Sequence, residues 1–183
     1  MTTYIAILRG INVSEKNKIK MAELRVSLAS LGFSHLKTYI QSGNIVFQHQ
    51  ETPISALEQS IHQNIMDTFG YDVPVLVRTQ TDWQTAFDNN PFLAENPETD
   101  IKYLHVTFLG ELPETEKITK TLAPENSTDA LIFAPPATHV YVHCPNGYGR
   151  TKLNNGFFER KLKVRATTRN WKTVTKLLLM TKD

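Results

Sequence analysis

The stretch HLKTYIQSGNIVFQH, residues 35–49, decides the fold. It contains two extended runs, 35–41 and 44–49, on either side of Ser42 and Gly43. Glycine readily adopts the positive φ that a tight hairpin turn needs, so the stretch predicts two antiparallel strands joined by a two-residue turn. The segments on each side of this hairpin then determine the topology.

Before the hairpin, TYIAILR (3–9) alternates as a strand and ends at Gly10. A helix is predicted next, because apolar residues recur at a spacing of three to four: Met21, Leu24, Leu28 and Leu31, followed by Gly32. After the hairpin, Thr52 is expected to cap a helix that begins at Pro53 and ends at Gly70. Its predicted buried face holds Leu57, Ile61, Ile65 and Phe69. With a last strand in VPVLVR (73–78), the order βαββαβ is that of a ferredoxin-like fold.

The second half repeats this order after a connector. Thr81 and Gln84 have the spacing of a capping box, which predicts a short helix through Trp83 and Phe87, and NNPFLAENPETD (89–100) is typical of a loop. The predicted elements that follow are a strand at 103–109, a helix at 113–122, a hairpin of 130–134 with 139–143, a helix from Gly149 to about Leu162, a strand at 164–168 and a final helix with Trp171.

We therefore predict an α+β protein made of two ferredoxin-like halves with antiparallel sheets, plus a C-terminal helix. The expected boundaries are 1–80 for the first half, 81–101 for a short helix and connector, and 102–183 for the second half with the last helix. The single cysteine, Cys144, excludes an internal disulfide framework and is typical of a reducing compartment. No segment has the length and hydrophobicity of a signal peptide or membrane anchor, so we expect a cytoplasmic protein that does not bind membranes.

Charge is distributed unevenly along the chain. Residues 148–183 contain ten Lys and Arg against two acidic residues, and residues 1–50 contain six against two, whereas residues 51–147 contain four against fourteen. One interpretation is that these charges only solvate separate faces or attract one another. The other is that the basic ends form a groove for an anionic ligand.

The segment GYGRTK (147–152) is the main candidate for an anion site. Two glycines followed by basic residues at the start of a predicted helix would offer free backbone N–H groups together with Arg150, Thr151 and Lys152. The spacing is neither that of a Walker loop nor that of a dinucleotide fingerprint. The alternative is that the segment merely turns the chain and that Thr151 caps the helix.

Two other loops hold candidate ligands. Arg9, Gly10 and Asn12 follow the first strand, where some ferredoxin-like phosphatases bind phosphate. Arg169 and Asn170 precede the last helix, which either Thr168 or Asn170 is expected to cap. The predicted binding residues are Arg9, Gly10, Asn12, Gly147, Tyr148, Gly149, Arg150, Thr151, Lys152, Arg169 and Asn170. Weaker contacts with a phosphate backbone are predicted for Lys16, Lys18, Arg150, Lys152, Arg165 and Arg169.

Four ordered motifs resemble an uncharacterised bacterial family that is catalogued as a domain of unknown function. They are YIAILRGIN, TYIQSGNIVF, HCPNGYGRTKL and TTRNWKTVTKLL, which span nearly the whole chain. The resemblance implies two ferredoxin-like halves and brings no activity, cofactor or partner with it. Where this family has a glycine pair after RGINV, the chain has Ser14 and Glu15.

Known catalytic motifs are absent from the sequence. There is no GxSxG or HExxH pattern, and the strands lack the ordered aromatic residues of an RNA-recognition domain. His139 and His143 without a third ligand do not define a zinc site, so we expect neither metal nor cofactor. The expected function is binding of a phosphorylated ligand, a nucleotide or nucleic acid, in a basic groove between the halves. An enzyme acting on a small phosphorylated substrate and a protein-interaction scaffold are the alternatives, and oligomeric state is left open.

Overall fold

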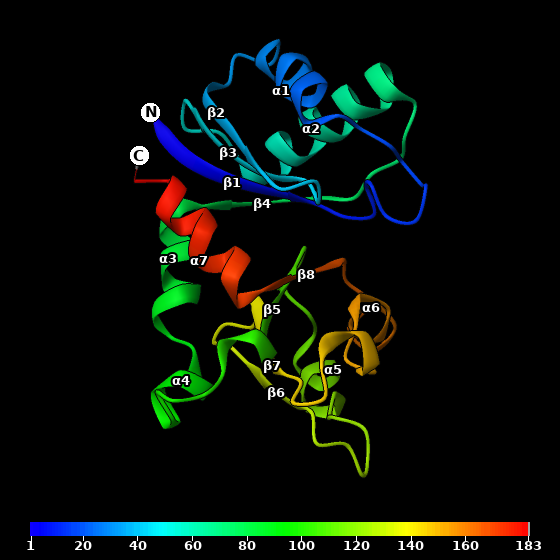
Figure 1. The fold of residues 1–183 in the computed structure, drawn as a ribbon, viewed down its shortest axis with the longest axis vertical. Coiled ribbons are helices and arrows are strands. Elements are labelled where there is room, and N and C mark those ends of the chain that lie inside the picture. The colour runs from blue at the N-terminus through cyan, green and yellow to red at the C-terminus, as the bar shows by residue number, and fades with distance from the viewer. Residues whose placement is uncertain (183) are drawn as a thin grey trace. The chain divides into compact units, whose positions relative to one another are not determined.

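Two four-stranded antiparallel sheets organise the chain, with strand orders β2-β3-β1-β4 and β6-β7-β5-β8 (Figure 1). The structure is a computed structural model that describes residues 1–182. It divides into two units, one formed by Met1–Gln84 together with the residues from Lys176 onward, and the other by Thr85–Thr175. Both strand orders are those that a βαββαβ chain gives in a ferredoxin-like fold, so the predicted fold class is confirmed.

The first unit follows the predicted order of elements. They are β1 (Thr2–Leu8), α1 (Met21–Ala29), β2 (Ser34–Tyr39), β3 (Asn44–His49), α2 (Ile54–Phe69) and β4 (Val75–Thr79). Both helices lie on one face of the sheet (Figure 1). Leu24 and Leu28 of α1 and Leu57, Ile61 and Ile65 of α2 pack there with the side chains of the central strands, as their spacing predicts.

The second unit repeats the arrangement with shorter helices. Its elements are β5 (Leu104–Leu109), α5 (Thr115–Lys120), β6 (Ala130–Phe133), β7 (His139–His143), α6 (Asn155–Leu162) and β8 (Ala166–Asn170). Phe157, Phe158 and Leu162 of α6 form its core with Val140 and Val142 of β7. Two further helices, α3 (Gln80–Asp88) and α7 (Trp171–Met180), each contain residues assigned to both units.

The hairpin in the first unit has a longer turn than predicted. Strand β2 ends at Tyr39, which pairs with Asn44, so four residues, 40–43, make the connection. Ile40 and Gly43 both have positive φ, at 50° and 75°. The side chain of Asn44 donates to the Tyr39 carbonyl at 3.1 Å and to the Ser42 hydroxyl at 2.9 Å, and these two hydrogen bonds stabilise the turn. The prediction of a two-residue turn was therefore wrong, although Ser42 and Gly43 do lie in the turn.

The N-terminal caps of α2 and α3 differ from the prediction. Thr52 does not cap α2, because its hydroxyl donates to the Gln50 carbonyl at 2.9 Å and Pro53 takes the cap position without a side-chain bond. The capping box of α3 lies two residues earlier than predicted: the Thr79 hydroxyl accepts from the Asp82 amide at 3.1 Å, and the Asp82 carboxylate accepts from the Thr79 amide at 3.4 Å. Capping depends on which oxygen lies nearest the free amides, and neighbouring Thr residues compete for that role.

The predicted loop at 89–100 also contains a short helix, α4 (Pro91–Glu95), and the 3₁₀ turn η1 (Ile101–Tyr103) follows it. Asn90 caps α4, since its side-chain oxygen accepts from the Phe92 amide at 3.0 Å. Proline at the first helical position suits this start, because its missing N–H would have no partner there.

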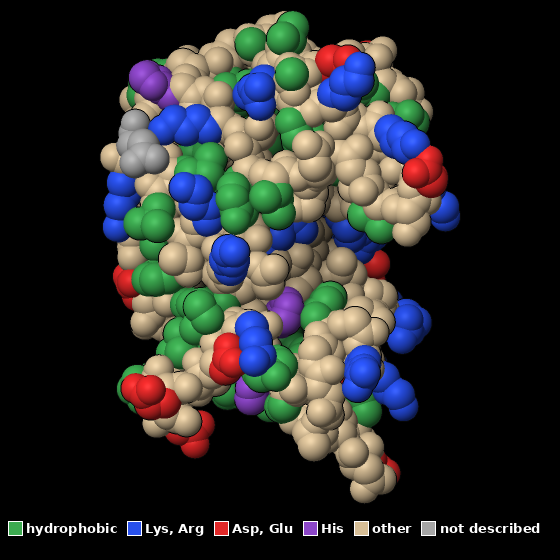
Figure 2. Space-filling view, in the orientation of Figure 1, with side chains coloured by type: hydrophobic (Ala, Val, Ile, Leu, Met, Phe, Trp, Pro, Cys, Tyr) green, Lys and Arg blue, Asp and Glu red, His purple; other side chains and the backbone are tan. Residues whose placement is uncertain are grey.

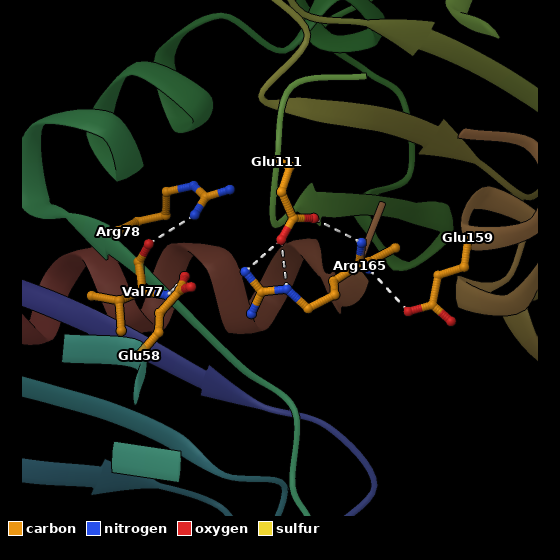
Figure 3. Close-up of polar contacts among 7 residues, drawn as sticks. Glu58, Val77, Arg78, Glu111, Glu159 and Arg165 are labelled. Carbon is orange, nitrogen blue, oxygen red and sulfur yellow. Dashed lines mark hydrogen bonds and ion pairs between the residues drawn. The ribbon is translucent and has the colours of Figure 1, made fainter. Parts of the chain in front are cut away.

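A common feature of the two units is a glutamate that binds an edge strand (Figure 3). Glu58 is the fifth residue of α2 and accepts a hydrogen bond from the Val77 amide of β4 at 2.9 Å. Glu159 is the fifth residue of α6 and accepts one from the Ala166 amide of β8 at 3.2 Å. Each edge strand pairs with a neighbour on one side only, so the carboxylate supplies an acceptor to an amide outside the ladder. Both halves thus have the same hydrogen bond from an edge-strand amide to a helix glutamate, which the sequence alone did not predict.

Among the described residues, the helices are all too short or too polar to cross a lipid bilayer.

Candidate functional site

The segment that follows β7 forms two successive turns before α6 begins. The Cys144 amide donates to the Tyr103 carbonyl, and the Gly147 amide donates to the Cys144 carbonyl, both at 2.9 Å. Gly147 has a φ of 87°, which glycine adopts without steric cost. The 3₁₀ turn η2 (Tyr148–Arg150) follows and leads into an extended stretch. The backbone therefore presents residues 150–152 on a loop.

Helix α6 begins at Asn155, later than the predicted start after Gly149. Asn154 is its N-cap, and its side-chain oxygen accepts from the Phe157 amide at 3.0 Å. The alternative in which Thr151 caps this helix was therefore wrong on the cap. The Thr151 hydroxyl instead accepts from the Leu153 amide at 3.0 Å and donates to the Asp129 carboxylate at 2.5 Å. Arg150 and Lys152 consequently precede the helix and do not flank its free amides.

A polar cavity of about 530 Å³ lies between this loop and the loop that precedes β6. Two hydrogen bonds join the loops, one from the Asn146 amide group to the Thr128 hydroxyl at 3.0 Å and the other from Thr151 to Asp129. The lining residues are Pro124, Glu125, Asn126, Ser127, Thr128, Asp129, Asn146, Arg150, Thr151 and Lys152. Both loops belong to the second unit, so the site is complete within it.

Charges in the cavity are arranged by loop. Arg150 and Lys152 come from the loop before α6, are exposed, and have side chains that form no hydrogen bond or ion pair within residues 1–182. Glu125 and Asp129 come from the loop before β6. Asp129 is half-buried and already accepts the Thr151 hydroxyl, whereas Glu125 is exposed. Two cations thus face a wall of hydroxyl, amide and carboxylate groups.

Three other predicted binding residues of the second unit make contacts within the fold. Tyr148 stacks on His105 with ring centroids 4.5 Å apart, and burial raises the pKa of its phenol. Asn170 caps α7 as predicted, since its side-chain oxygen accepts from the Thr173 amide at 2.8 Å. Arg169 donates to the Thr168 carbonyl at 3.0 Å, and burial lowers its pKa to about 10. None of the three lines the cavity.

Cys144 does not have the environment of a nucleophile. Its side chain is buried, and burial raises the pKa of the thiol to about 11, so the thiolate that would attack a substrate is disfavoured at neutral pH. Trp171 is also buried, and its ring stacks on that of Phe87 with centroids 5.3 Å apart. The described residues hold no group of three or more His, Cys, Asp or Glu suited to a metal ion.

The loop after β1 uses its predicted ligands for internal bonds. The Asn12 side chain donates to the carbonyls of Ile19 and Gln41, each at 2.8 Å, and accepts from the Ile19 amide at 2.8 Å. It thereby ties the loop to the hairpin turn. Gly10 has a φ of 76°, and its carbonyl accepts from the side chain of Asn17 at 3.0 Å.

A second cavity of about 560 Å³ lies beside this loop, and its cations are paired. Lys18 pairs with Glu15, and Lys20 pairs with Glu23 at 3.3 Å. Arg9 lines neither cavity and belongs to the first unit, while Arg150 and Arg169 belong to the second. The expected convergence of basic segments from both halves therefore stays a prediction.

Arg165, one of the residues predicted to contact phosphate, is engaged by a carboxylate (Figure 3). Its Nε and Nη2 atoms lie 2.8 Å from Glu111, which also accepts from the Arg165 backbone amide at 3.1 Å. Figure 2 shows Lys and Arg spread over much of the visible face, several of them beside Asp or Glu. Net charge along the sequence therefore overstates the number of cations that are available to a ligand.

The sequence pattern of a family described as "Protein of unknown function (DUF1697)" matches residues 1–138, about three quarters of the 183 residues. The chain belongs to the DUF1697 family. A solved structure, described as "The structure of conserved bacterial protein SP0830 from Streptococcus pneumoniae", is similar with a TM-score of 0.72, 24% sequence identity and coverage of 98% of both chains. This similarity shows that the fold is shared. No curated protein matches the chain.

The DUF1697 match includes the loop at 124–129, which sequence reasoning did not select, and ends before the loop at 146–152, which it did. A signal for the first loop was present, because PENSTD (124–129) is a run of turn-forming and hydrogen-bonding residues directly before a strand. Such runs are common in turns that bind nothing. Only the second loop, which begins 17 positions after Asp129, makes this one part of a cavity.

Proposed function

We propose that this DUF1697 protein binds a phosphorylated ligand in the cavity between residues 124–129 and 146–152. Arg150 and Lys152 are the proposed phosphate contacts, with Asn146 and the hydroxyls of Ser127 and Thr128 as neutral donors. The observation that carries the proposal is that both cations line a polar cavity and have no carboxylate partner within residues 1–182.

The chemistry of the cavity supports an anionic ligand of small size. Arginine and lysine donate charge-assisted hydrogen bonds to phosphate oxygens, and each such bond contributes about 1.5–3 kcal/mol. The volume of about 530 Å³ is typical of small-molecule sites. Asp129 holds Thr151 across the gap at 2.5 Å, so part of the site is ordered before a ligand arrives.

Calorimetric titration with inorganic phosphate and with phosphorylated metabolites tests the proposal. The double variant Arg150→Ala/Lys152→Ala removes both cations from exposed positions, so folding is expected to survive. Its affinity should be about 10- to 100-fold lower than that of the wild type.

Arg160→Ala/Lys161→Ala is the matched control, because it removes the same charge from exposed residues of α6 outside the cavity. Its affinity should equal that of the wild type. The proposal is wrong if no phosphorylated compound binds, or if both double variants lose affinity to the same extent, since general electrostatic attraction would then explain the binding.

A further inference from the structure

The 124–129 loop, which lines the cavity together with the two cations, indicates the chemistry of the part of the ligand beyond its phosphate group. We infer that the ligand is a phosphorylated polyol, such as a sugar phosphate, whose hydroxyls are held by the 124–129 loop. This inference rests on the proposed binding of phosphate by Arg150 and Lys152.

Carboxylates beside a phosphate site need a reason, because they repel the anion. Glu125 and Asp129 line the same cavity as the two cations, so an inorganic phosphate is attracted by the cations and repelled by the carboxylates. A ligand hydroxyl changes this balance, since it donates to a carboxylate in a strong charge-assisted bond. Glu125 has no partner within residues 1–182, and Asp129 uses one oxygen for Thr151, so acceptor capacity remains on both.

Neutral groups between the carboxylates extend the same preference. Asn126, Ser127 and Thr128 lie between Glu125 and Asp129 along the loop, and Asn146 lies across from them. Amides and hydroxyls both donate and accept, which matches the hydroxyls of a polyol. An ammonium group would instead favour a dense set of carboxylates, and Asp129 is already partly engaged.

Nucleotides and nucleic acids fit the cavity less well. None of its ten lining residues is aromatic, and proline is the only apolar one. Base recognition draws on aromatic stacking, which contributes about 1–3 kcal/mol per base. The sugar-phosphate backbone of a nucleic acid would also place several negative charges near the two carboxylates. The lining therefore favours a small hydroxylated ligand over the nucleotide or nucleic acid predicted from the sequence.

Calorimetry on the 183-residue chain separates these ligand classes with four probes: inorganic phosphate, a hexose 6-phosphate, cyclohexyl phosphate and adenosine monophosphate. Cyclohexyl phosphate has a ring of similar size but no hydroxyl. We expect the hexose phosphate to bind about tenfold more tightly than cyclohexyl phosphate or the nucleotide, since one to two hydrogen bonds to charged groups supply that factor.

The variant Glu125→Ala gives an effect of opposite sign on two probes. It should weaken the hexose phosphate severalfold, because an acceptor is lost, and should strengthen cyclohexyl phosphate, because a repulsive charge is lost. A merely structural role of Glu125 would weaken both. Asp129→Asn, which keeps an acceptor for Thr151, should act in the same direction with a smaller effect.

The outcomes distinguish this inference from the proposal beneath it. If inorganic phosphate and cyclohexyl phosphate bind through Arg150 and Lys152 as tightly as the hexose phosphate, the hydroxyl inference is overturned and the anion site stands. Equal or tighter binding of the nucleotide also overturns it. If none of the four probes binds, both ideas fail together.

Discussion

Replacing Gly43 by alanine tests how the hairpin turn is fitted against the first strand. Gly43 has a φ of 75°, and its carbonyl accepts a hydrogen bond from the Leu8 amide at 2.8 Å. A Cβ at this position would lie 2.5 Å from Leu8 Cβ and 2.9 Å from Ile11 Cδ1. Leu8 and Ile11 are 0% and 1% exposed, so neither side chain can move aside into solvent.

Two costs follow from this geometry. A positive φ costs an ordinary L-residue about 1–2 kcal/mol, and forcing a methyl group into a packed core costs about 1–3 kcal/mol. Together they predict that Gly43→Ala lowers the free energy of unfolding by about 2–5 kcal/mol. The accompanying loss of chain entropy in the unfolded state works in the opposite direction and is small.

Gly70→Ala is the matched control. Gly70 ends α2 with a φ of 74°, and a Cβ there would meet no atom within 4 Å. It therefore has the same backbone cost and the same change in the unfolded state, without the contact with Leu8. Urea denaturation followed by circular dichroism should give a loss of about 1–2 kcal/mol for this variant. Equal losses in the two variants would refute the steric explanation of Gly43.

Three further predictions concern the loop after β1, the edge strands and pH. Glu15 has a φ of 70°, so Glu15→Gly should raise the free energy of unfolding by about 0.5 kcal/mol. If urea denaturation gives a lower free energy of unfolding instead, the ion pair with Lys18 contributes more than the backbone strain. Glu58→Ala should cost about 1–3 kcal/mol and the more exposed Glu159→Ala about 0.5–1.5 kcal/mol. Equal shifts of the urea midpoint, or a larger shift for Glu159→Ala, would exclude burial as the cause of this order. Burial lowers the pKa of His105 below 6.5, so below about pH 6.5 the unfolded chain binds a proton that the folded protein resists, and stability falls as pH decreases. His105→Gln should lose less melting temperature than the wild type between about pH 7.5 and about pH 5.5, and identical losses would exclude His105 as a cause.

The fold was predictable because local patterns and topology agree. The apolar spacing of Leu57, Ile61 and Ile65 identifies the buried face of α2, and alternation identifies the strands of both halves. The order βαββαβ then leaves few arrangements for four antiparallel strands. Element ends were harder to predict, since Thr79 rather than Thr81 caps α3 and the choice depends on a single hydrogen bond of about 1 kcal/mol.

The candidate site was only half predictable, because a cavity needs two segments. Arg150 and Lys152 were selected for their charge, and that selection did not depend on the loop that faces them. Glu125 and Asp129 lie more than 20 residues earlier and carry no motif of their own. Charge counts along the chain also missed local pairing, as the contacts of Arg165 with Glu111 demonstrate.

The late start of α6 changes the physical basis of the proposed anion site. A site at a helix N-terminus would draw on backbone amides and the helix dipole, which no side-chain substitution removes. Asn154 caps α6 and accepts from the Phe157 amide, and no residue of α6 lines the cavity, so the attraction must come from Arg150 and Lys152. Both side chains are exposed, so their attraction for an anion is screened by salt over about 10 Å at 0.1 M. Phosphate affinity at this site should therefore fall steeply with ionic strength and fall about 10- to 100-fold in the Arg150→Ala/Lys152→Ala variant, whereas a helix-terminus site would keep most of its affinity in that variant.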